Sequence, residues 1–147
     1  MSISKEFILA GKAIFTVECN GSLSPKPHYT FKVRRKEATL QYPETVFVSL
    51  LTGSDNNSSY TYLGILNPDT GAIRLTAKST YREDSYPVRL LNRILARIWN
   101  NEHAAYEAAG FATHHENRCC KCGKRLTTPA SVTAGIGPEC IKMLAGV

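Results

Sequence analysis

Four of the five cysteines in this 147-residue chain lie between positions 119 and 140. Cys119 and Cys122 stand three positions apart and precede Gly123, which permits the tight turn that lets two thiolates hold one ion. Cys140 follows a Gly-Pro pair typical of a helix start. An odd number of cysteines gathered at one end favours a metal site over a disulfide framework. Because thiolates prefer Zn²⁺ to Mg²⁺ or Ca²⁺, the pattern predicts a treble-clef-like module over residues 112–147 that binds structural zinc.

A closed structural zinc site needs a fourth ligand. A treble-clef helix often supplies it three residues after its first cysteine, but that position holds Met143, a poor ligand for zinc. His115 lies four residues before Cys119, close enough to complete the shell. His114 and Cys120 are alternatives, and Cys120 ranks last because it lies between two ligating cysteines and should point away from the ion. We predict four zinc ligands: His115, Cys119, Cys122 and Cys140.

The residues between the cysteines have the pattern of a short helix. Thr128 is suited to cap this helix, Pro129 to start it and Gly135 to end it. The intervening Thr, Pro, Ser and Gly residues therefore have structural roles, and none of them requires a catalytic one.

This segment resembles a zinc-knuckle family of uncharacterised function that is common in bacteriophage proteins. Members carry a pattern like C-x-x-C-G-R-x-L-T-x-P-x-S and close with G-I-G-P-x-C, similar to residues 119–140 here. The phage branch often has His-Glu before the first cysteine, as His115-Glu116 does, which supports His115 as a ligand. Cys120 departs from the family, where a small or polar residue is usual. Weaker similarity to the preceding strand region of these phage proteins involves "AGKAIFTV", "FVSLLTGSDN" and "YTYLGIL".

The chain before the module changes its hydrophobic period once. Up to about residue 81, alternating and β-branched segments separated by Gly, Pro and Asn predict about five antiparallel strands. From Tyr86, apolar residues at helical spacing predict an amphipathic helix, and an Ala-rich stretch predicts a second helix that ends near Gly110. We therefore expect an α+β protein in which residues 1–111 form a small twisted sheet packed with one amphipathic helix.

Charge indicates the class of partner. Lys and Arg outnumber Asp and Glu by 18 to 12, which gives a net charge of +6 and a pI near 9.2. Such a balance favours anionic partners. The basic residues gather on one strand, on one face of the amphipathic helix and around the cysteines. We predict that these groups bind nucleic acid or another partner: Lys32, Arg34, Arg35, Lys36, Arg89, Arg93, Arg97, Arg118, Lys121, Lys124 and Arg125.

Aromatic residues on the predicted strands suggest two roles. Tyr29, Phe31, Tyr60 and Tyr62 are candidates for stacking on bases, as in sheet-based binders of single strands. Packing in a half-buried sheet is the simpler explanation, and we favour it.

Catalysis is not expected. A catalytic zinc needs an open position for water and a nearby base, and three thiolates leave little positive charge to activate water. The sequence contains no phosphate loop, nucleophile elbow or paired-carboxylate motif. The string "HHEN" is similar to nuclease motifs, but it lacks the second C-x-x-C that usually supports them. A zinc-dependent nuclease is therefore the less favoured reading, and we predict that the protein is not an enzyme.

We expect a phage-encoded, zinc-stabilised basic protein that engages nucleic acid or a host complex that handles nucleic acid. The alternative is a phage anti-defence inhibitor, anti-CRISPR-like for example, that acts by protein–protein contact without binding nucleic acid itself. No small-molecule substrate is evident. No stretch approaches the roughly 18 apolar residues that span a bilayer, and the N-terminal apolar run is too short for a signal peptide. We therefore expect no membrane partner and a location in the host cytoplasm.

Overall fold

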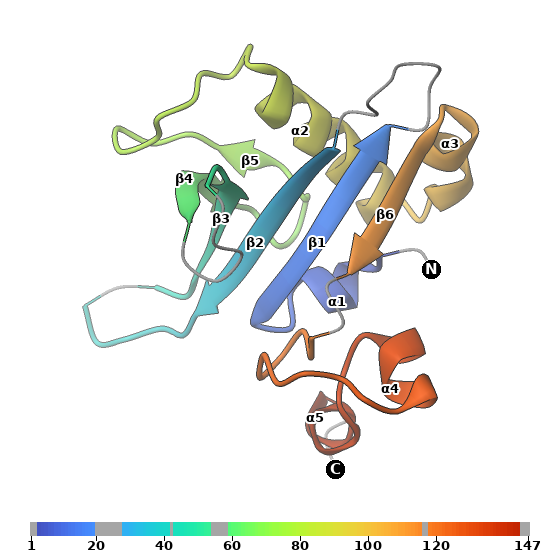
Figure 1. Ribbon diagram of the computed structural model, residues 1–147. Helices are drawn as coiled ribbons and strands as arrows, with labels where there is room; N and C mark the ends of the chain where they lie inside the picture. The colour runs from blue at the N-terminus through green and yellow to red at the C-terminus, as the bar shows by residue number, and fades with distance from the viewer. Residues whose placement is uncertain (1–2, 20–27, 42, 54–58, 116–117, 145–147) are drawn as a thin grey trace.

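The computed structural model describes residues 3–19, 28–41, 43–53, 59–115 and 118–144, with backbone alone at positions 19, 143 and 144. It is an α+β protein, as predicted, built on an antiparallel sheet with helices (Figure 1). The strands are β1 (Lys12–Cys19), β2 (His28–Lys36), β3 (Thr45–Leu51), β4 (Tyr60–Leu66), β5 (Ile73–Arg74) and β6 (Phe111–His115). The helices are α1 (Lys5–Ile8), α2 (Tyr86–Trp99), α3 (His103–Ala108), α4 (Pro129–Ala134) and α5 (Pro138–Leu144).

The sheet is a meander that a late strand extends. Its order is β5-β4-β3-β2-β1-β6, and all neighbouring strands are antiparallel. The five predicted strands form in sequence, although β5 is reduced to two residues. The sixth strand, β6, was not predicted, and it pairs with β1 so that His115 lies opposite Phe15. We expected the zinc-binding module to begin at residue 112. In the structure, residues 111–115 form β6, so a strand of the sheet leads directly into the cysteine-rich segment.

The two faces of the sheet differ in burial because side chains alternate along each strand. One face packs against α2, which lies behind the sheet in Figure 1. The helix contributes the residues predicted from its spacing, and Leu91, Ile94 and Ile98 are fully buried. The sheet side of this core is formed by Ala13, Phe15, Val17, Phe31, Val33, Val46, Val48, Leu50, Leu63 and Leu66.

The N-terminal residues before β1 form a helix that was not predicted. Ser4 caps α1 by accepting a hydrogen bond from the Phe7 backbone N–H at 3.1 Å. Phe7 and Ile8 are buried in the core. The apolar run of this segment is too short to show a helical period in the sequence. Among the described residues, no helix has the length and apolar character needed to cross a membrane.

Candidate metal centre and basic surface

The first two cysteines lie in a tight hairpin. The Cys119 N–H donates to the Lys124 carbonyl oxygen at 2.8 Å, and the Gly123 N–H donates to the Cys119 carbonyl oxygen at 2.9 Å. Gly123 has a φ of 81°, in the left-handed region that favours glycine. Arg118 and Arg125 close the hairpin as an antiparallel bridge. The C-x-x-C-G pattern thus forms the turn expected from its sequence.

The chain between the hairpin and Cys140 forms the short helix and the helix start that were predicted. Thr128 caps α4 by accepting from the Ser131 N–H at 3.3 Å. Gly135 ends that helix with a φ of 72°. The next helix, α5, begins at Pro138, so Cys140 lies in its first turn. We call residues 118–144 the cysteine module.

Three thiols converge at the centre of the cysteine module. The Sγ atoms of Cys119, Cys122 and Cys140 all lie within 4.8 Å of one another. Zn–S bonds of about 2.3 Å in a tetrahedral site place sulfurs about 3.8 Å apart, so a small contraction would bring all three onto one ion. Cys119 and Cys140 are buried, and Cys122 is partly exposed. This donor set fits a thiophilic metal such as zinc, for which it would supply three of the four ligands of a structural site.

Backbone groups of the module stabilise one thiolate. Burial raises the pKa of Cys119, but hydrogen bonds from backbone groups of Gly137, Cys122 and Lys121 outweigh it and lower the pKa to about 7. The Gly137 N–H lies 3.3 Å from the Cys119 Sγ. Burial, followed by hydrogen bonds with the neighbouring thiols, raises the pKa of Cys140 to about 11. A metal that binds here must therefore displace protons from the group.

The structure does not bring His115 into the thiol group. Among the described His, Cys, Asp and Glu side chains, that group comprises three cysteines alone. The His115 Nε2 lies 2.6 Å from the Val132 carbonyl oxygen of α4, and its ring centroid lies 6.0 Å from that of Phe7. His115 therefore connects the end of the sheet to the cysteine module.

The two alternative fourth ligands also lie elsewhere. The His114 Nε2 is 3.4 Å from the Glu18 Oε2 on β1. Cys120 is only 3% exposed, and burial raises the pKa of its thiol to about 12. Its side chain belongs to the hydrophobic core, and its backbone N–H donates to the Gly135 carbonyl oxygen at 3.0 Å. Glu116 and the side chain of Met143 lie outside the described residues.

Replacing His115 tests whether it is a ligand or a structural link. We expect His115→Ala to retain one zinc ion per chain and the cobalt-substituted thiolate absorption of the wild type. Its thermal midpoint should fall, because the contacts to Val132 and Phe7 are lost and a hydrogen bond contributes about 1 kcal/mol to stability. Metal content and visible absorption of the cobalt form measure the outcome. A loss of metal with a shifted cobalt spectrum would restore His115 as the fourth ligand.

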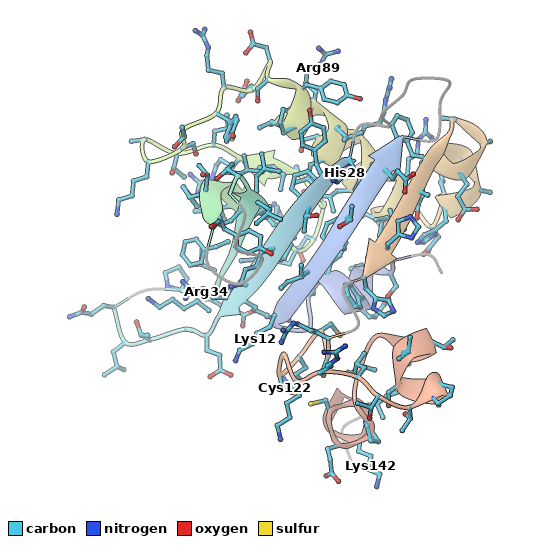
Figure 2. All side chains as sticks on the ribbon, in the orientation of Figure 1. Lys12, His28, Arg34, Arg89, Cys122 and Lys142 are labelled. Atoms are coloured by element: carbon cyan, nitrogen blue, oxygen red, sulfur yellow. The ribbon has the colours of Figure 1, made fainter. Side chains whose placement is uncertain are left out.

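The cysteine module is attached to the start of β1. The Lys12 N–H donates to the Cys120 carbonyl oxygen at 2.7 Å. A methyl group at Gly123 would lie 3.6 Å from the Lys12 Cδ, so the Lys12 side chain passes along the hairpin. Lys12 also lies directly opposite Arg34 on β2. Figure 2 shows Lys12 between Arg34 and Cys122.

Two of the three predicted basic clusters therefore meet at one place. We call this surface the basic junction. Glu37 and Glu44 line a hollow beside it together with Lys12 and Lys121, and Glu44 is ion-paired with Arg35. We define the basic junction as Lys12, Arg34 and Lys121 together with the hairpin cations Arg118, Lys124 and Arg125. Lys12 was missed as a binding candidate because it stands alone in the sequence.

The other predicted binding residues are separate from this surface or already paired. Arg35 donates to Glu44 and to the Leu9 carbonyl oxygen. Arg97 forms an ion pair with Glu102 at 3.1 Å. The helix cluster also lies apart, because Arg89 is at the opposite end of the molecule from Cys122 in Figure 2. The remaining predicted cations on the sheet are Lys32, which faces away from the core, and Lys36 at the end of β2.

Residues 109–144 match the model of a family of unknown function, DUF6011. The matched segment covers β6 and the cysteine module, including all three converging thiols. No curated protein and no solved structure matches the chain. The match agrees with the sequence resemblance to a family of uncharacterised function for this segment.

Proposed function

We propose that this protein is a non-catalytic binding protein whose cysteine module is held by a structural zinc ion and whose basic junction engages nucleic acid. The resemblance to phage proteins supports a phage origin and action in the host cytoplasm, on nucleic acid or on a host complex that handles it. The proposal has three parts, namely the metal, the partner and the absence of catalysis, and each has its own support.

The observation that carries the nucleic-acid proposal is the strand register at the basic junction, which places like-charged residues opposite each other at two positions. Lys12 lies directly opposite Arg34 across β1 and β2, and Arg118 lies directly opposite Arg125 across the hairpin. Like charges directly opposite each other destabilise an antiparallel pair. A polyanion would relieve both repulsions together. The rigid hairpin and sheet would present these cations to phosphates with little loss of conformational entropy.

The environment of the thiols supports a structural metal. Cys119 and Cys140 are buried, and hydrogen bonds from the surrounding backbone orient the Cys119 sulfur. Three thiolates donate enough charge to leave zinc a weak activator of water. The module is small and its two helices are short, so the metal would stabilise the fold of the module.

Salt-dependent binding tests the partner. We expect labelled DNA or RNA to bind at low ionic strength, with log K falling linearly with log salt concentration by about 0.7 to 0.9 per phosphate contact. The double variant Lys12→Gln/Arg34→Gln should weaken binding and lower this slope by about 1 to 2, because two phosphate contacts are removed. Fluorescence anisotropy at several salt concentrations measures both quantities.

A matched double variant controls for net charge. Lys78 and Arg82 are exposed residues in the segment between β5 and α2, away from the basic junction. Lys78→Gln/Arg82→Gln removes the same charge and should retain wild-type affinity and slope. Equal losses in the two double variants would show that net charge alone attracts the ligand. If the wild type binds no nucleic acid at low salt, the proposal fails and the alternative of inhibition by protein–protein contact takes its place.

A further inference from the structure

We propose that the face of the sheet opposite α2 binds single-stranded nucleic acid, with bases stacked on Phe47 and Tyr60 and phosphates near Lys32 and Arg34. The inference rests on the proposed function and adds the form of nucleic acid and the surface that selects it. We call this surface the outer face.

Strand register places these four residues on the outer face. Phe31 and Val33 are buried in the core, so Lys32 and Arg34 point to the other side of β2. Phe47 lies directly opposite Arg34. Tyr60 lies near Lys32, as their side-chain contact shows. None of the helices that the structure describes lies in front of this face in Figure 1.

Each of the two aromatic rings is accompanied by a cation. The Lys32 Nζ lies 5.2 Å from the centroid of the Tyr60 ring. The Arg34 Cζ lies 5.6 Å from the centroid of the Phe47 ring. Both rings are partly exposed. Both cations lie over the faces of their rings, so a base that stacks there would displace the cation towards the neighbouring phosphate. Rings and cations grouped in this way match a single strand, in which an exposed base alternates with a phosphate.

The charge of the strands favours an anionic partner over an apolar or basic protein surface, and the aromatic rings among the cations favour nucleic acid over an acidic protein. The six strands contain one carboxylate, Glu18, and it contacts His114. They contain six cationic residues, namely Lys12, Lys32, Arg34, Arg35, Lys36 and Arg74, of which Arg35 is ion-paired with Glu44. A second copy of this chain would oppose the same positive charges, which disfavours self-association through this face.

The outer face is continuous with the basic junction. Arg34 belongs to both surfaces, since it contacts Phe47 and lies opposite Lys12. A strand that stacks on the outer face would thus reach the hairpin of the cysteine module. A duplex keeps its bases stacked internally and offers only its phosphates. The basic junction alone would therefore bind both forms, whereas the outer face would add affinity for single strands.

The structure changes which aromatic residues are candidates for stacking on bases. Phe31, a candidate from sequence, is fully buried in the core. Tyr29 packs against Tyr86 of α2, with ring centroids 5.7 Å apart. Phe47 was not considered from sequence, yet it lies on the outer face beside Tyr62, with centroids 6.2 Å apart. The stacking surface is thus formed by β3 and β4.

Competing forms of one oligonucleotide test the inference. We expect the wild type to bind a single-stranded oligothymidine more tightly than a duplex of equal length at the same salt concentration. Phe47→Leu and Tyr60→Leu should each weaken single-strand binding by about 5- to 150-fold, the loss of one stacked base. Both variants should bind the duplex as the wild type does, because they keep the cations.

Conservative variants separate stacking from folding. Tyr60→Phe keeps the ring and should retain single-strand affinity, whereas Tyr60→Leu should not. Tyr86→Leu removes an exposed aromatic ring of α2, away from the proposed stacking residues, and should retain the single-strand affinity of the wild type. Cross-linking of a 4-thiothymidine oligonucleotide, mapped by mass spectrometry, gives a second readout on the wild-type protein. We expect cross-links on β3 and β4.

The outcomes distinguish the inference from the proposed function. Equal affinity for single strand and duplex, or cross-links confined to the cysteine module, would overturn the outer face as a binding site while nucleic-acid binding stands. Loss of affinity in Tyr60→Phe equal to that in Tyr60→Leu would exclude stacking as its cause. Absence of binding to either form would overturn the proposed function together with the inference.

Discussion

Removal of zinc is expected to unfold the cysteine module and to lower the thermal midpoint of the whole protein. Structural zinc contributes about 10–16 kcal/mol of binding free energy in zinc-finger peptides. The helices of the module add little stability of their own, because α4 and α5 contain six and seven residues and helices this short are not stable alone. Its buried apolar side chains include Leu126 and Ile136.

Metal analysis and hydrogen exchange measure this prediction. Purified protein should contain one zinc ion per chain, and a strong chelator should raise amide exchange over residues 118–140. Cys122→Ser should give the same result without chelator, since it removes a converging thiol that is only partly buried. The matched control is Cys120→Ala, which should retain zinc because the Cys120 thiol lies outside the ligand group. Unchanged exchange after metal removal would show that the module folds without an ion.

Truncation of Leu91 is expected to have the second largest effect. Leu91 of α2 is fully buried against the sheet. Leu→Ala changes in a packed core cost about 2–5 kcal/mol, through lost burial and the cavity left behind. Since the free energy of unfolding of small domains is only about 5–15 kcal/mol, Leu91→Ala should remove a large part of the stability of this protein.

Urea unfolding followed by circular dichroism measures the loss. The control is Arg93→Ala, since Arg93 is exposed and lies two residues further along the same helix. This change should alter the free energy of unfolding by less than about 0.5 kcal/mol. The comparison holds helix propensity nearly constant, because both variants introduce alanine. Similar midpoints for the two variants would mean that α2 does not close the core.

The fold was predictable where a pattern repeats along the chain. Alternating and β-branched segments identified β1 to β4, and the helical spacing of Leu91, Ile94 and Ile98 identified α2. The five residues of β6 were missed because they contain too few alternations to show a period. Pairing with β1 makes that segment a strand, and this is a long-range interaction that local propensity does not encode.

The candidate site was likewise predictable where local structure positions its residues. Ligand spacing identified Cys119, Cys122 and Cys140, because the hairpin and the helix start that position them are local structures. The fourth ligand depends on tertiary placement, whereas His115 was suggested by its proximity in the sequence and by the family resemblance. Lys12 shows the same limit in the basic junction, because only strand pairing brings it between Arg34 and the hairpin.

The attachment of the hairpin to β1 links the proposed binding of zinc to the proposed binding of nucleic acid. One hydrogen bond joins the backbone of Lys12 to that of Cys120, so the first residue of the sheet and the segment between two proposed zinc ligands hold each other in place. A metal that orders this contact would also order the cations around it. The coupling is reciprocal, because if zinc raises the affinity for nucleic acid, bound nucleic acid raises the affinity for zinc by the same factor. Metal supply would then set how strongly the protein holds its partner.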